Sequence, residues 1–262
     1  MKAYSRSKET QAPVLFVGHG SPMNAIEDSR ARAGWSDMGK QLGKPSVILA
    51  VSAHWAARET LVSAAESNRQ IFDMYGFPKE LYEVKYAPAG SPELARKALE
   101  LLGDAAREDH AWGIDHGIWS ILSNMYPEAD VPVVMISTNI NASPKTLFEI
   151  GKRLQPLRRE GAMILASGNV VHNLRLVDWS MSGGYEWADA FDRTIRDAVT
   201  DGRISVPLEY QSIHGFRQSV PTAEHYDPLL VALGAVSNTD TVTVWNEYRE
   251  LGSMSMTSYL WK

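Results

Sequence analysis

The stretch "PVLFVGHGSPMNAIED", residues 13–28, joins a short apolar run to a histidine that has a glycine on each side. Its four apolar residues, two of them β-branched, predict a buried strand over 14–17. The Gly-His-Gly tripeptide centred on His19 and the Ser-Pro pair after it are typical of a turn, so the strand is expected to end there. The stretch therefore predicts a buried strand that brings His19 to one edge of a sheet.

Two other apolar runs lead to a histidine in the same way. The run "SVILAVSAH" ends at His54, and "MILASGNVVH" ends at His172. A single histidine at a strand end is more often a hydrogen-bonded rim residue than a ligand. Three at the carboxyl ends of buried strands, where open α/β sheets bind their ligands, favour a metal site or an acid–base site. The small residues beside them, such as Gly18 and Gly20, predict a close approach of a flat ligand.

The apolar runs alternate with segments that have the periodicity of amphipathic helices. Strands are predicted at 14–17, 46–52, 131–138, 162–167 and 241–245. Helices are predicted within 91–104, 143–161, 185–202 and 227–236. This order predicts an α/β fold, in which a single domain has a central, largely parallel or mixed sheet flanked by helices. The domain is expected to cover residues 13–262, after a disordered lead-in over 1–12.

The composition narrows the possible functions. With 26 Lys and Arg against 31 Asp and Glu, the net charge is −5 and no basic cluster stands out, which disfavours nucleic-acid binding. No apolar run has the length of a membrane span, and the chain starts without the apolar core of a signal peptide, so a cytoplasmic location is expected. The absence of cysteine excludes disulfides, thiolate metal sites and cysteine nucleophiles. Any metal site must therefore use His, Asp and Glu, which is typical of a catalytic metal.

Four further histidines differ in their surroundings. His116 lies in "WGIDHGIW", another His-Gly pair between aromatic residues, and His225 lies in "PTAEHYDPLL", where a helix is expected to begin. His110 and His214 lie in polar loops, and we expect both to be solvated, although His214 stands close before the His225 segment. The residues alone therefore add His116 and His225 to the three strand-end histidines as site candidates.

Five ordered motifs carry a resemblance to a known family. In chain order they are "GHGSPMNAIED", "SAHW", "WGIDHG", "SGNVVHNL" and "AEHYDPLL". The stretch "GFPKELYEVKYAPAGSPELA" adds to them. Together they resemble the motifs of class III extradiol ring-cleaving dioxygenases, in the branch of the 4,5-DOPA dioxygenases that includes bacterial enzymes. The likeness runs from about residue 13 to the C-terminus.

The resemblance implies a role for each candidate histidine. His19, His54 and His225 match the metal ligands of the family. His172 matches a histidine that acts as acid and base, and that some descriptions of this branch count as a fourth metal ligand. His116 matches a further active-site histidine that interacts with oxygen or substrate. The implied reaction opens a DOPA-like catechol with O₂ at a non-haem Fe(II) and gives a muconic semialdehyde, in a single α/β domain.

Two departures from the family pattern leave points open. Better-known members of the wider class hold iron with two histidines and one carboxylate, whereas here His225 takes the third position and Glu224 is its neighbour. Relatives in the DOPA branch often read Asn-Pro-Thr-Pro before the last Glu-His-Tyr, and this chain has Val220 and Ala223 in that segment. The role of Glu224 and the identity of the catechol therefore stay open, as do the oligomeric state and the metal in the cell.

Three other functions compete with ring opening. A zinc-dependent hydrolase could use the same histidines to lower the pKa of a bound water. A non-catalytic descendant of the fold would be expected to lose ligand histidines, and all of those that match are present. A phosphatase is disfavoured because Gly18 stands where that chemistry wants an arginine. For the dioxygenase, Fe(II) is the active metal, but a nitrogen-rich site binds zinc more tightly, so we expect zinc in protein purified in air.

Overall fold

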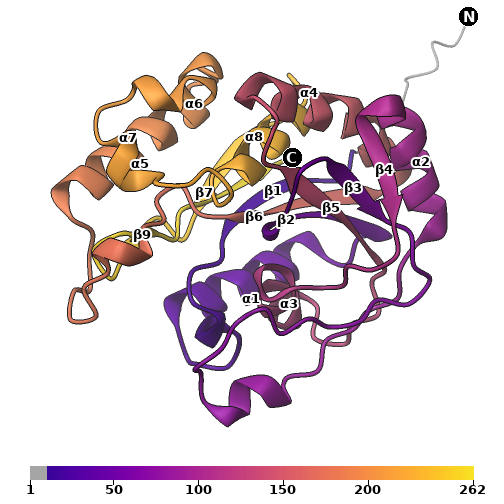
Figure 1. Ribbon diagram of the computed structural model, residues 1–262, viewed down its shortest axis with the longest axis horizontal. Coiled ribbons are helices and arrows are strands. Elements are labelled where there is room, and N and C mark those ends of the chain that lie inside the picture. The colour runs from indigo at the N-terminus through magenta and orange to yellow at the C-terminus, as the bar shows by residue number, and fades with distance from the viewer. Residues whose placement is uncertain (1–10) are drawn as a thin grey trace, which may run out of the picture.

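The structure is a computed structural model that describes residues 11–262, and its centre is one eight-stranded sheet (Figure 1). The strand order is β4-β3-β5-β2-β6-β1-β10-β7. The strands of this sheet are β1 (Val14–Gly18), β2 (Val47–Ala57), β3 (Thr60–Ser63), β4 (Ala106–Asp109), β5 (Val133–Asn139), β6 (Ala162–Gly168), β7 (Val242–Trp245) and β10 (Ser258–Trp261). A separate two-stranded sheet pairs β8 (Arg249–Glu250) with β9 (Met254–Ser255). The predicted lead-in over 1–12 lies, except for its last two residues, outside the described part of the chain.

The four middle strands run parallel to one another. β2 pairs in parallel with both β5 and β6, and β1 pairs in parallel with β6. β10 is antiparallel to β1 and β7, and β3 is antiparallel to β5. The carboxyl ends of β5, β2, β6 and β1 therefore meet at one edge of the sheet, which is where ligands of such sheets bind. The predicted α/β fold with a central mixed sheet is confirmed.

Helices cover both faces of the sheet (Figure 1). The α-helices are α1 (Arg30–Leu42), α2 (Pro92–Leu102), α3 (His116–Met125), α4 (Pro144–Leu154), α5 (Glu186–Thr200), α6 (Ser205–Leu208), α7 (Phe216–Ser219) and α8 (Asp227–Ala235). The 3₁₀ helices are η1 (Pro22–Ala25), η2 (Lys79–Glu83), η3 (Gly103–Ala105), η4 (Gln155–Glu160), η5 (Leu174–Leu176) and η6 (Tyr210–Ser212). α1 and α3 lie on one face of the sheet, and α2, α4 and α8 lie on the other.

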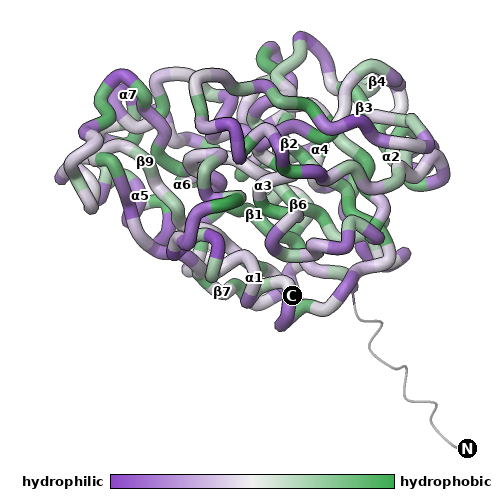
Figure 2. The backbone as a smooth tube through the Cα atoms, turned by 90° about the horizontal axis from the view of Figure 1, so that it is seen from below, coloured by the Kyte–Doolittle hydropathy of each residue, from purple (hydrophilic) through white to green (hydrophobic). Residues whose placement is uncertain are grey.

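Alternating side chains of each middle strand divide the core into two layers. In β1, Val14 and Phe16 pack toward α4 and α8, whereas Leu15 and Val17 pack toward α1 and α3. Because helices cover both faces of the sheet, the side chains on both faces of each middle strand are buried. The middle strands are therefore continuous apolar runs rather than alternating polar and apolar residues. Figure 2 shows the same pattern, with the hydrophobic segments around β1 and β6 in the middle of the molecule.

The Ser-Pro pairs in the sequence form the N-caps of two helices. Ser91 accepts a hydrogen bond from the backbone N of Leu94 at 3.3 Å, and Ser143 accepts one from Thr146 at 3.1 Å, each with proline at the first helical position. α4 ends at Leu154, just before a proline, and continues as the 3₁₀ helix η4. These helix predictions are confirmed.

The strand predictions differ from the structure in the extent of β2 and in five short strands that were not predicted, namely β3, β4, β8, β9 and β10. β2 continues to Ala57 with a register shift between Ser52 and Ala56, so His54 lies within an irregular end of the strand rather than after it. β10 lies between β1 and β7 near the C-terminus and was not predicted, because its four residues, Ser258–Trp261, include no β-branched residue. Among residues 11–262, no helix combines the length and apolar character that crossing a bilayer requires. The cytoplasmic location stays a prediction.

Candidate metal centre

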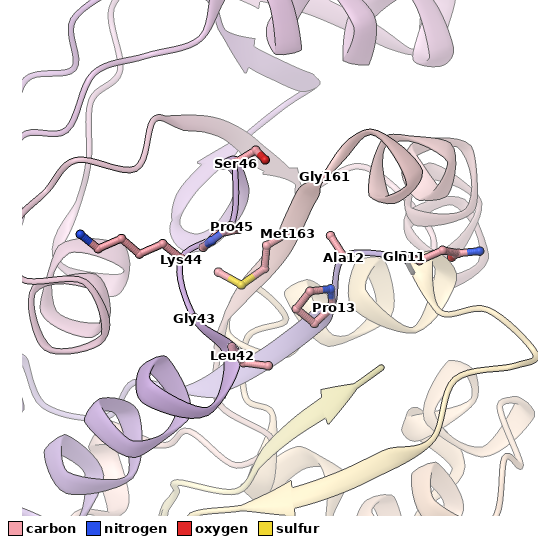
Figure 3. A pocket seen from close by; sticks show the side chains of 10 residues that line it. All are labelled: Gln11, Ala12, Pro13, Leu42, Gly43, Lys44, Pro45, Ser46, Gly161 and Met163. Atoms are coloured by element: carbon pink, nitrogen blue, oxygen red, sulfur yellow. The ribbon is translucent and has the colours of Figure 1, made fainter. Parts of the chain in front are cut away.

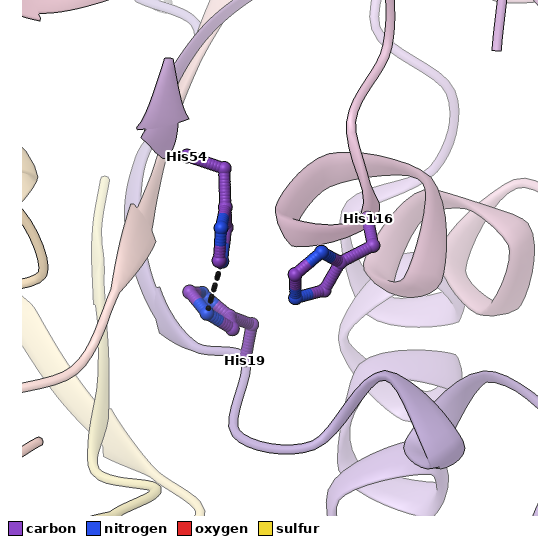
Figure 4. Close-up of side chains that lie close together, drawn as sticks. All are labelled: His19, His54 and His116. Carbon is purple, nitrogen blue, oxygen red and sulfur yellow. Dashed lines mark hydrogen bonds between the residues drawn. The ribbon is translucent and has the colours of Figure 1, made fainter. Parts of the chain in front are cut away.

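Five histidines gather at the carboxyl edge of the sheet. The ring centroids of His19 and His54 are 5.0 Å apart, and the His116 centroid lies 3.9 Å from that of His54 (Figure 4). The His225 ring lies 5.3 Å from His19 and 3.5 Å from His172. All five predicted site histidines therefore come together, although they are far apart in the sequence.

Each histidine comes from the end of a different element. His19 directly follows β1, His54 lies in the irregular end of β2, and His172 follows β6. His116 is the first residue of α3, and His225 stands two residues before α8. The other two histidines are exposed, as predicted: the His110 side chain is 67% exposed and contacts Glu108, and His214 lies on the surface.

Burial keeps the central rings neutral. Burial lowers the pKa of His19 well below its usual value, and the neighbouring histidines, His54 first, lower it further. Burial, followed by the charge of His116, lowers the pKa of His54 in the same way. The pKa of His225 is also lowered by burial, which outweighs the opposite effect of Glu224. At pH 7 these imidazoles are therefore neutral, and each carries one N–H and one lone pair.

The partner of His19 fixes its tautomer. His19 Nδ1 lies 2.9 Å from Ser167 Oγ, and the Ser167 hydroxyl donates its only proton to the carbonyl oxygen of Gly117 at 2.5 Å. Ser167 Oγ can therefore only accept from His19, so the proton of the His19 ring is on Nδ1. The lone pair of His19 is then on Nε2, which points toward the other rings (Figure 4).

A carboxylate fixes two more rings. Asp73 Oδ2 lies 2.9 Å from His116 Nδ1 and 3.2 Å from His54 Nδ1. Burial would raise the pKa of Asp73, but the hydrogen bonds and charge of His116 outweigh it, so the pKa lies below its usual value and the group is an anion. An anion can only accept, so the Nδ1 atoms of both rings carry a proton, and the neutral ring of His54 keeps its lone pair on Nε2.

The resulting arrangement suits a cation. His19 Nε2 and His54 Nε2 lie 3.1 Å apart, and the two tautomers leave no proton between them (Figure 4). Two nitrogens bound to a metal at about 2.1 Å stand about 3 Å apart at a right angle, so the spacing fits two ligands of one ion. The candidate ligand nitrogens of His19, His54 and His116 all lie within 4.8 Å of one another. The residues present therefore fit a metal ion.

His225 also has a buried ring nitrogen that could bind a metal ion. Its Nδ1 lies 3.4 Å from Glu224 Oε1, while its Nε2 is buried and has no hydrogen-bond partner among the described residues. Burial would raise the pKa of Glu224, but its hydrogen bonds with His225 and Thr222 lower it to about 2. Glu224 thus contacts the outer nitrogen of His225 and leaves the inner nitrogen free, as carboxylates do behind metal ligands.

His172 differs from the other four rings. It stacks on His225 with 3.5 Å between centroids and 3° between planes. Within residues 11–262, no hydrogen bond holds either nitrogen of the His172 ring, whereas its backbone N donates to the carbonyl of Ser219 at 2.9 Å. Burial and the charge of His225 lower the pKa of His172 well below its usual value. This ring is therefore neutral and free to take up or release a proton.

The glycines beside the histidines make room for protein rather than for a ligand. A Cβ on Gly18 would come within 2.7 Å of the Met256 carbonyl carbon, and one on Gly20 within 2.5 Å of Met256 Sδ. A Cβ on Gly168 would lie 2.2 Å from the carbonyl oxygen of His225. The prediction that Gly18 and Gly20 open a path for a flat ligand is wrong, because Met256 fills that space. Gly168 instead lets the His225 segment pack directly on β6.

The sequence prediction missed three polar residues of the site. Asp73 lies in an irregular segment between β3 and η2 and is part of no motif, and Ser167 was read only as the end of a strand. Asp115 directly precedes His116 in the sequence and was not among the predicted site residues. It accepts hydrogen bonds from Ser52 at 2.7 Å and Trp112 at 3.1 Å, and burial, together with the charge of Asp73, raises its pKa to about 6. The Asp-His pairing in "IDHG" was the one available signal.

A pocket of about 250 Å³ lies at the opposite edge of the sheet, where β1, β2 and β6 begin (Figure 3). Among the described residues that line it, Lys44 is the one charged side chain and none is a histidine. Lys44 is already paired with Glu128 at 2.5 Å and Asp130 at 2.6 Å. This pocket therefore offers no catalytic groups, and the histidine cluster remains the candidate site.

Comparison with known proteins identifies the family. Residues 13–259 match the family described as the catalytic LigB subunit of aromatic ring-opening dioxygenase. The chain belongs to this family. The prediction of a class III extradiol dioxygenase is thereby confirmed: the LigB protein described here is a dioxygenase, and a zinc-dependent hydrolase is not favoured. LigB enzymes depend on a metal ion, and the histidines at the carboxyl edge can hold one.

Individual relatives agree with the family. The chain is 44% identical to the 4,5-DOPA dioxygenase extradiol of Escherichia coli (strain K12), over 95% of this chain and 94% of the relative. It is 33% identical to the 4,5-DOPA dioxygenase extradiol of Beta vulgaris, over 97% of both chains. The crystal structure of an uncharacterized protein from Escherichia coli K12 superposes with a TM-score of 0.84 at 40% identity, over 95% of this chain and 99% of that one. The LigB fold is therefore shared over nearly the whole chain.

Proposed function

We propose that this LigB protein opens the ring of a DOPA-like catechol beside its hydroxyl groups, using O₂ and an Fe(II) ion, and releases a muconic semialdehyde. The observation that carries the proposal is the pair of Nε2 lone pairs of His19 and His54, 3.1 Å apart at the carboxyl edge of the sheet. The relatives from Escherichia coli and Beta vulgaris are 4,5-DOPA dioxygenases, which supports a DOPA-type catechol as the substrate class.

His19, His54 and His225 are the proposed metal ligands. The candidate ligand nitrogens of His19, His54 and His116 lie within 4.8 Å of one another, but the His225 Nε2 is buried and has no hydrogen-bond partner among the described residues. An unsatisfied buried polar atom costs about 1–3 kcal/mol, and a metal bond would remove that cost. His225 is therefore preferred as the third ligand, and His172, stacked on it, stays a possible fourth.

Iron is preferred to zinc because of the reaction. Fe(II), when bound, supplies the redox chemistry that O₂ activation needs, and zinc has none. Zinc nevertheless binds nitrogen ligands more tightly than Fe(II), so protein purified in air is expected to contain zinc or no metal.

His172 is the proposed acid–base catalyst. A catechol hydroxyl must lose its proton before the ring reacts, and the product side must regain one. His172 has a neutral ring without a hydrogen bond from the described residues, whereas Ser167, Asp73 and Glu224 contact the Nδ1 atoms of the other four. It is therefore the ring that can hold a proton at one step and return it at the next.

His116 is the second proposed catalytic residue. Asp73 fixes its Nδ1 at 2.9 Å, so its Nε2 faces the same space as the ring of His54. From there it can hydrogen-bond to oxygen or to a substrate hydroxyl. Its position beside the proposed ligands, at the start of α3, supports this role over that of a solvated surface residue.

Val220 and Ala223, where the chain differs from the pattern of the DOPA branch, bear on the choice of substrate. Val220 is 8% exposed and packs in the hydrophobic core, so its side chain affects the segment rather than a ligand. Ala223 is partly exposed and is the position at which a different catechol could be selected.

The test is to load metal-free protein with Fe(II) under anaerobic conditions and then measure O₂ uptake. The panel should contain DOPA, protocatechuate and simple catechol, with product formation followed by absorbance. We expect uptake that depends on both Fe(II) and a catechol, with DOPA turned over best. Equal turnover by the zinc-loaded protein, or no uptake with any catechol, would contradict the proposal.

A further inference from the structure

Asp73 is an acidic residue whose side chain points into the protein from an exposed backbone. It lies in the irregular segment between β3 and η2, and the residue as a whole is exposed. Its side chain is only 14% exposed, however, and ends among the histidines. A carboxylate that leaves water needs hydrogen bonds in return, and the contacts of Asp73 show where it finds them.

The carboxylate of Asp73 has three contacts with two histidines. Oδ1 accepts a hydrogen bond from the backbone N of His116 at 2.9 Å. Oδ2 accepts one from His116 Nδ1 at 2.9 Å and lies 3.2 Å from His54 Nδ1. One oxygen therefore contacts both rings at once, on the side away from the candidate metal position.

Asp73 also acts as the cap of α3. The helix begins at His116, and the residue before it, Asp115, makes no capping hydrogen bond because its carboxylate is bonded to Ser52 and Trp112. Asp73, 43 residues earlier in the chain, bonds the free N–H of His116 instead. A carboxylate is favoured at the first turn of a helix, where the unpaired N–H groups carry partial positive charge.

The segment that carries Asp73 is fixed to the segment before α3. The backbone N of Ile71 donates to the carbonyl of Ile114 at 2.8 Å, and the N of Ile114 donates to Arg69 at 2.8 Å. The indole N of Trp119 in α3 donates to the carbonyl of Ile71 at 2.9 Å. Asp73 is thus held at a set position relative to α3, while its contact with His54 reaches across to β2.

We propose that Asp73 is the shared positioning residue of the metal centre. Its one carboxylate holds a proton on the Nδ1 atoms of both His54 and His116, and so directs His54 Nε2 to the metal and His116 Nε2 to the space beside it. The inference rests on the proposed function only in requiring that a metal ion binds this cluster. Ser167 and Glu224 each contact one ring, so the loss of Asp73 disturbs two rings where the loss of either of them disturbs one.

The first test measures metal affinity, not activity. Metal-free wild type, Asp73→Asn and Asp73→Ala are titrated with Zn²⁺ in competition with a chelator, and the Co²⁺ forms are compared by visible absorption. Loss of a carboxylate behind a metal-bound histidine weakens metal binding about 10–100-fold, and we expect at least that loss for Asp73→Ala. Asp73→Asn keeps one acceptor oxygen and is expected to fall between Asp73→Ala and wild type.

The matched control is Asp178→Asn. Asp178 also holds an irregular segment, through the backbone N of Ser180 at 2.9 Å and its hydroxyl at 2.6 Å, but contacts no histidine. We expect this variant to bind Zn²⁺ and Co²⁺ like wild type. Wild-type affinity and an unchanged Co²⁺ spectrum in Asp73→Ala would overturn the proposal, as would an equal loss in Asp178→Asn.

A second measurement needs no variant and therefore does not depend on how a variant folds. Long-range ¹H–¹⁵N spectra of the metal-free wild type report which ring nitrogen of each histidine carries the proton. We expect Nδ1–H for both His54 and His116, and Nε2–H for either would overturn the proposal. If Asp73→Ala loses metal affinity but wild type shows no catechol-dependent O₂ uptake, the proposed function fails and the role of Asp73 stands.

Discussion

The two edges of the central sheet bury polar groups in opposite ways. At the amino edge, where β1 and β6 begin, the Arg158 side chain is fully buried. It donates to the carbonyls of Ala12 at 2.7 Å and Ala235 at 2.9 Å, and it binds both carboxylate oxygens of Asp240 at 2.7 and 3.0 Å. The charge is neutralised and four of the five N–H donors are used, so this buried arginine is paired within the chain.

The carboxyl edge is incomplete without a ligand. Ser167, Asp73 and Glu224 contact the outer Nδ1 atoms of its histidines, but these residues leave the inner Nε2 atoms unsatisfied. His225 Nε2 has no partner in the described chain, and the Nε2 atoms of His19 and His54 face each other. A buried cluster whose polar groups are hydrogen-bonded to one another is therefore structural. A cluster that is hydrogen-bonded only on its outer side is a binding site.

Removing a ligand histidine gives the largest expected effect. His54→Ala should abolish both metal binding and catechol-dependent O₂ uptake, because His54 shares its Nε2 contact with His19. The apo variant should still fold, since within residues 11–262 the His54 Nε2 contacts only the Nε2 of His19. Metal content by mass spectrometry of the native protein and circular dichroism check the two parts. Unfolding of the apo variant would show that the cluster is structural, and the contrast between the edges would disappear.

Acid should destabilise the metal-free protein through the same histidines. Burial, the largest cause, lowers the pKa of His19, His54, His172 and His225, so the unfolded chain binds more protons than the folded one below the unfolded pKa of about 6.5. Stability should therefore be constant above about pH 7 and fall below it, by up to about 1.4 kcal/mol per pH unit for each histidine.

Urea unfolding at pH 7.5, 6.5 and 5.5 measures this slope. The control is apo His54→Ala, which has one buried histidine fewer and should show a smaller slope. An unchanged free energy of unfolding between pH 7.5 and 5.5 would contradict the neutral, buried rings on which the metal site depends.

Removing the buried ion pair at the amino edge should destabilise the fold and leave metal binding unchanged. Arg158→Met removes the partner of Asp240, whose side chain is only 6% exposed, and leaves a buried charge without its counter-ion. Such a loss costs about 3–5 kcal/mol. We expect a lower midpoint in urea but wild-type Zn²⁺ affinity. If Arg158→Met also lost metal affinity, the two edges would be coupled rather than independent.

The fold could be predicted because its signals are local. Continuous apolar runs indicated the strands that are covered on both faces, and Ser-Pro pairs indicated the starts of α2 and α4. β10 could not be predicted, because its place between β1 and β7 depends on pairing with residues at the other end of the chain. The irregular end of β2 could not be predicted for a related reason, because its register shift between Ser52 and Ala56 depends on the pairing with β5.

The candidate site could be predicted as far as its histidines. Strand ends and His-Gly motifs carry a signal, and all five predicted histidines lie in one cluster. Asp73 could not be predicted, because it lies in an irregular segment and its partners His54 and His116 are distant in the sequence. The roles of Gly18 and Gly20 were misread for the same reason, since Met256, which fills their space, comes from near the C-terminus.

Substituting His172 separates the effect of proton transfer from that of metal binding. His172→Phe keeps a flat ring that can stack on His225 but has no nitrogen. We expect metal content to stay at the wild-type level and kcat to fall by about 10²-fold or more, as loss of a general acid–base does. Steady-state O₂ uptake and metal analysis on the same sample measure both. If the metal is lost instead, His172 is a fourth ligand, and no ring of the cluster is free.

The smallest expected effect tests the pocket at the amino edge. Lys44→Ala removes the one charged side chain among the described residues of that pocket, together with its contacts to Glu128 and Asp130. Because all three side chains are largely exposed, their ion pairs contribute little to stability, so the unfolding midpoint should hardly change. The KM for the catechol should also be unchanged, because Lys44 lies at the opposite edge of the sheet from the histidines. A raised KM would instead place substrate recognition at the amino edge.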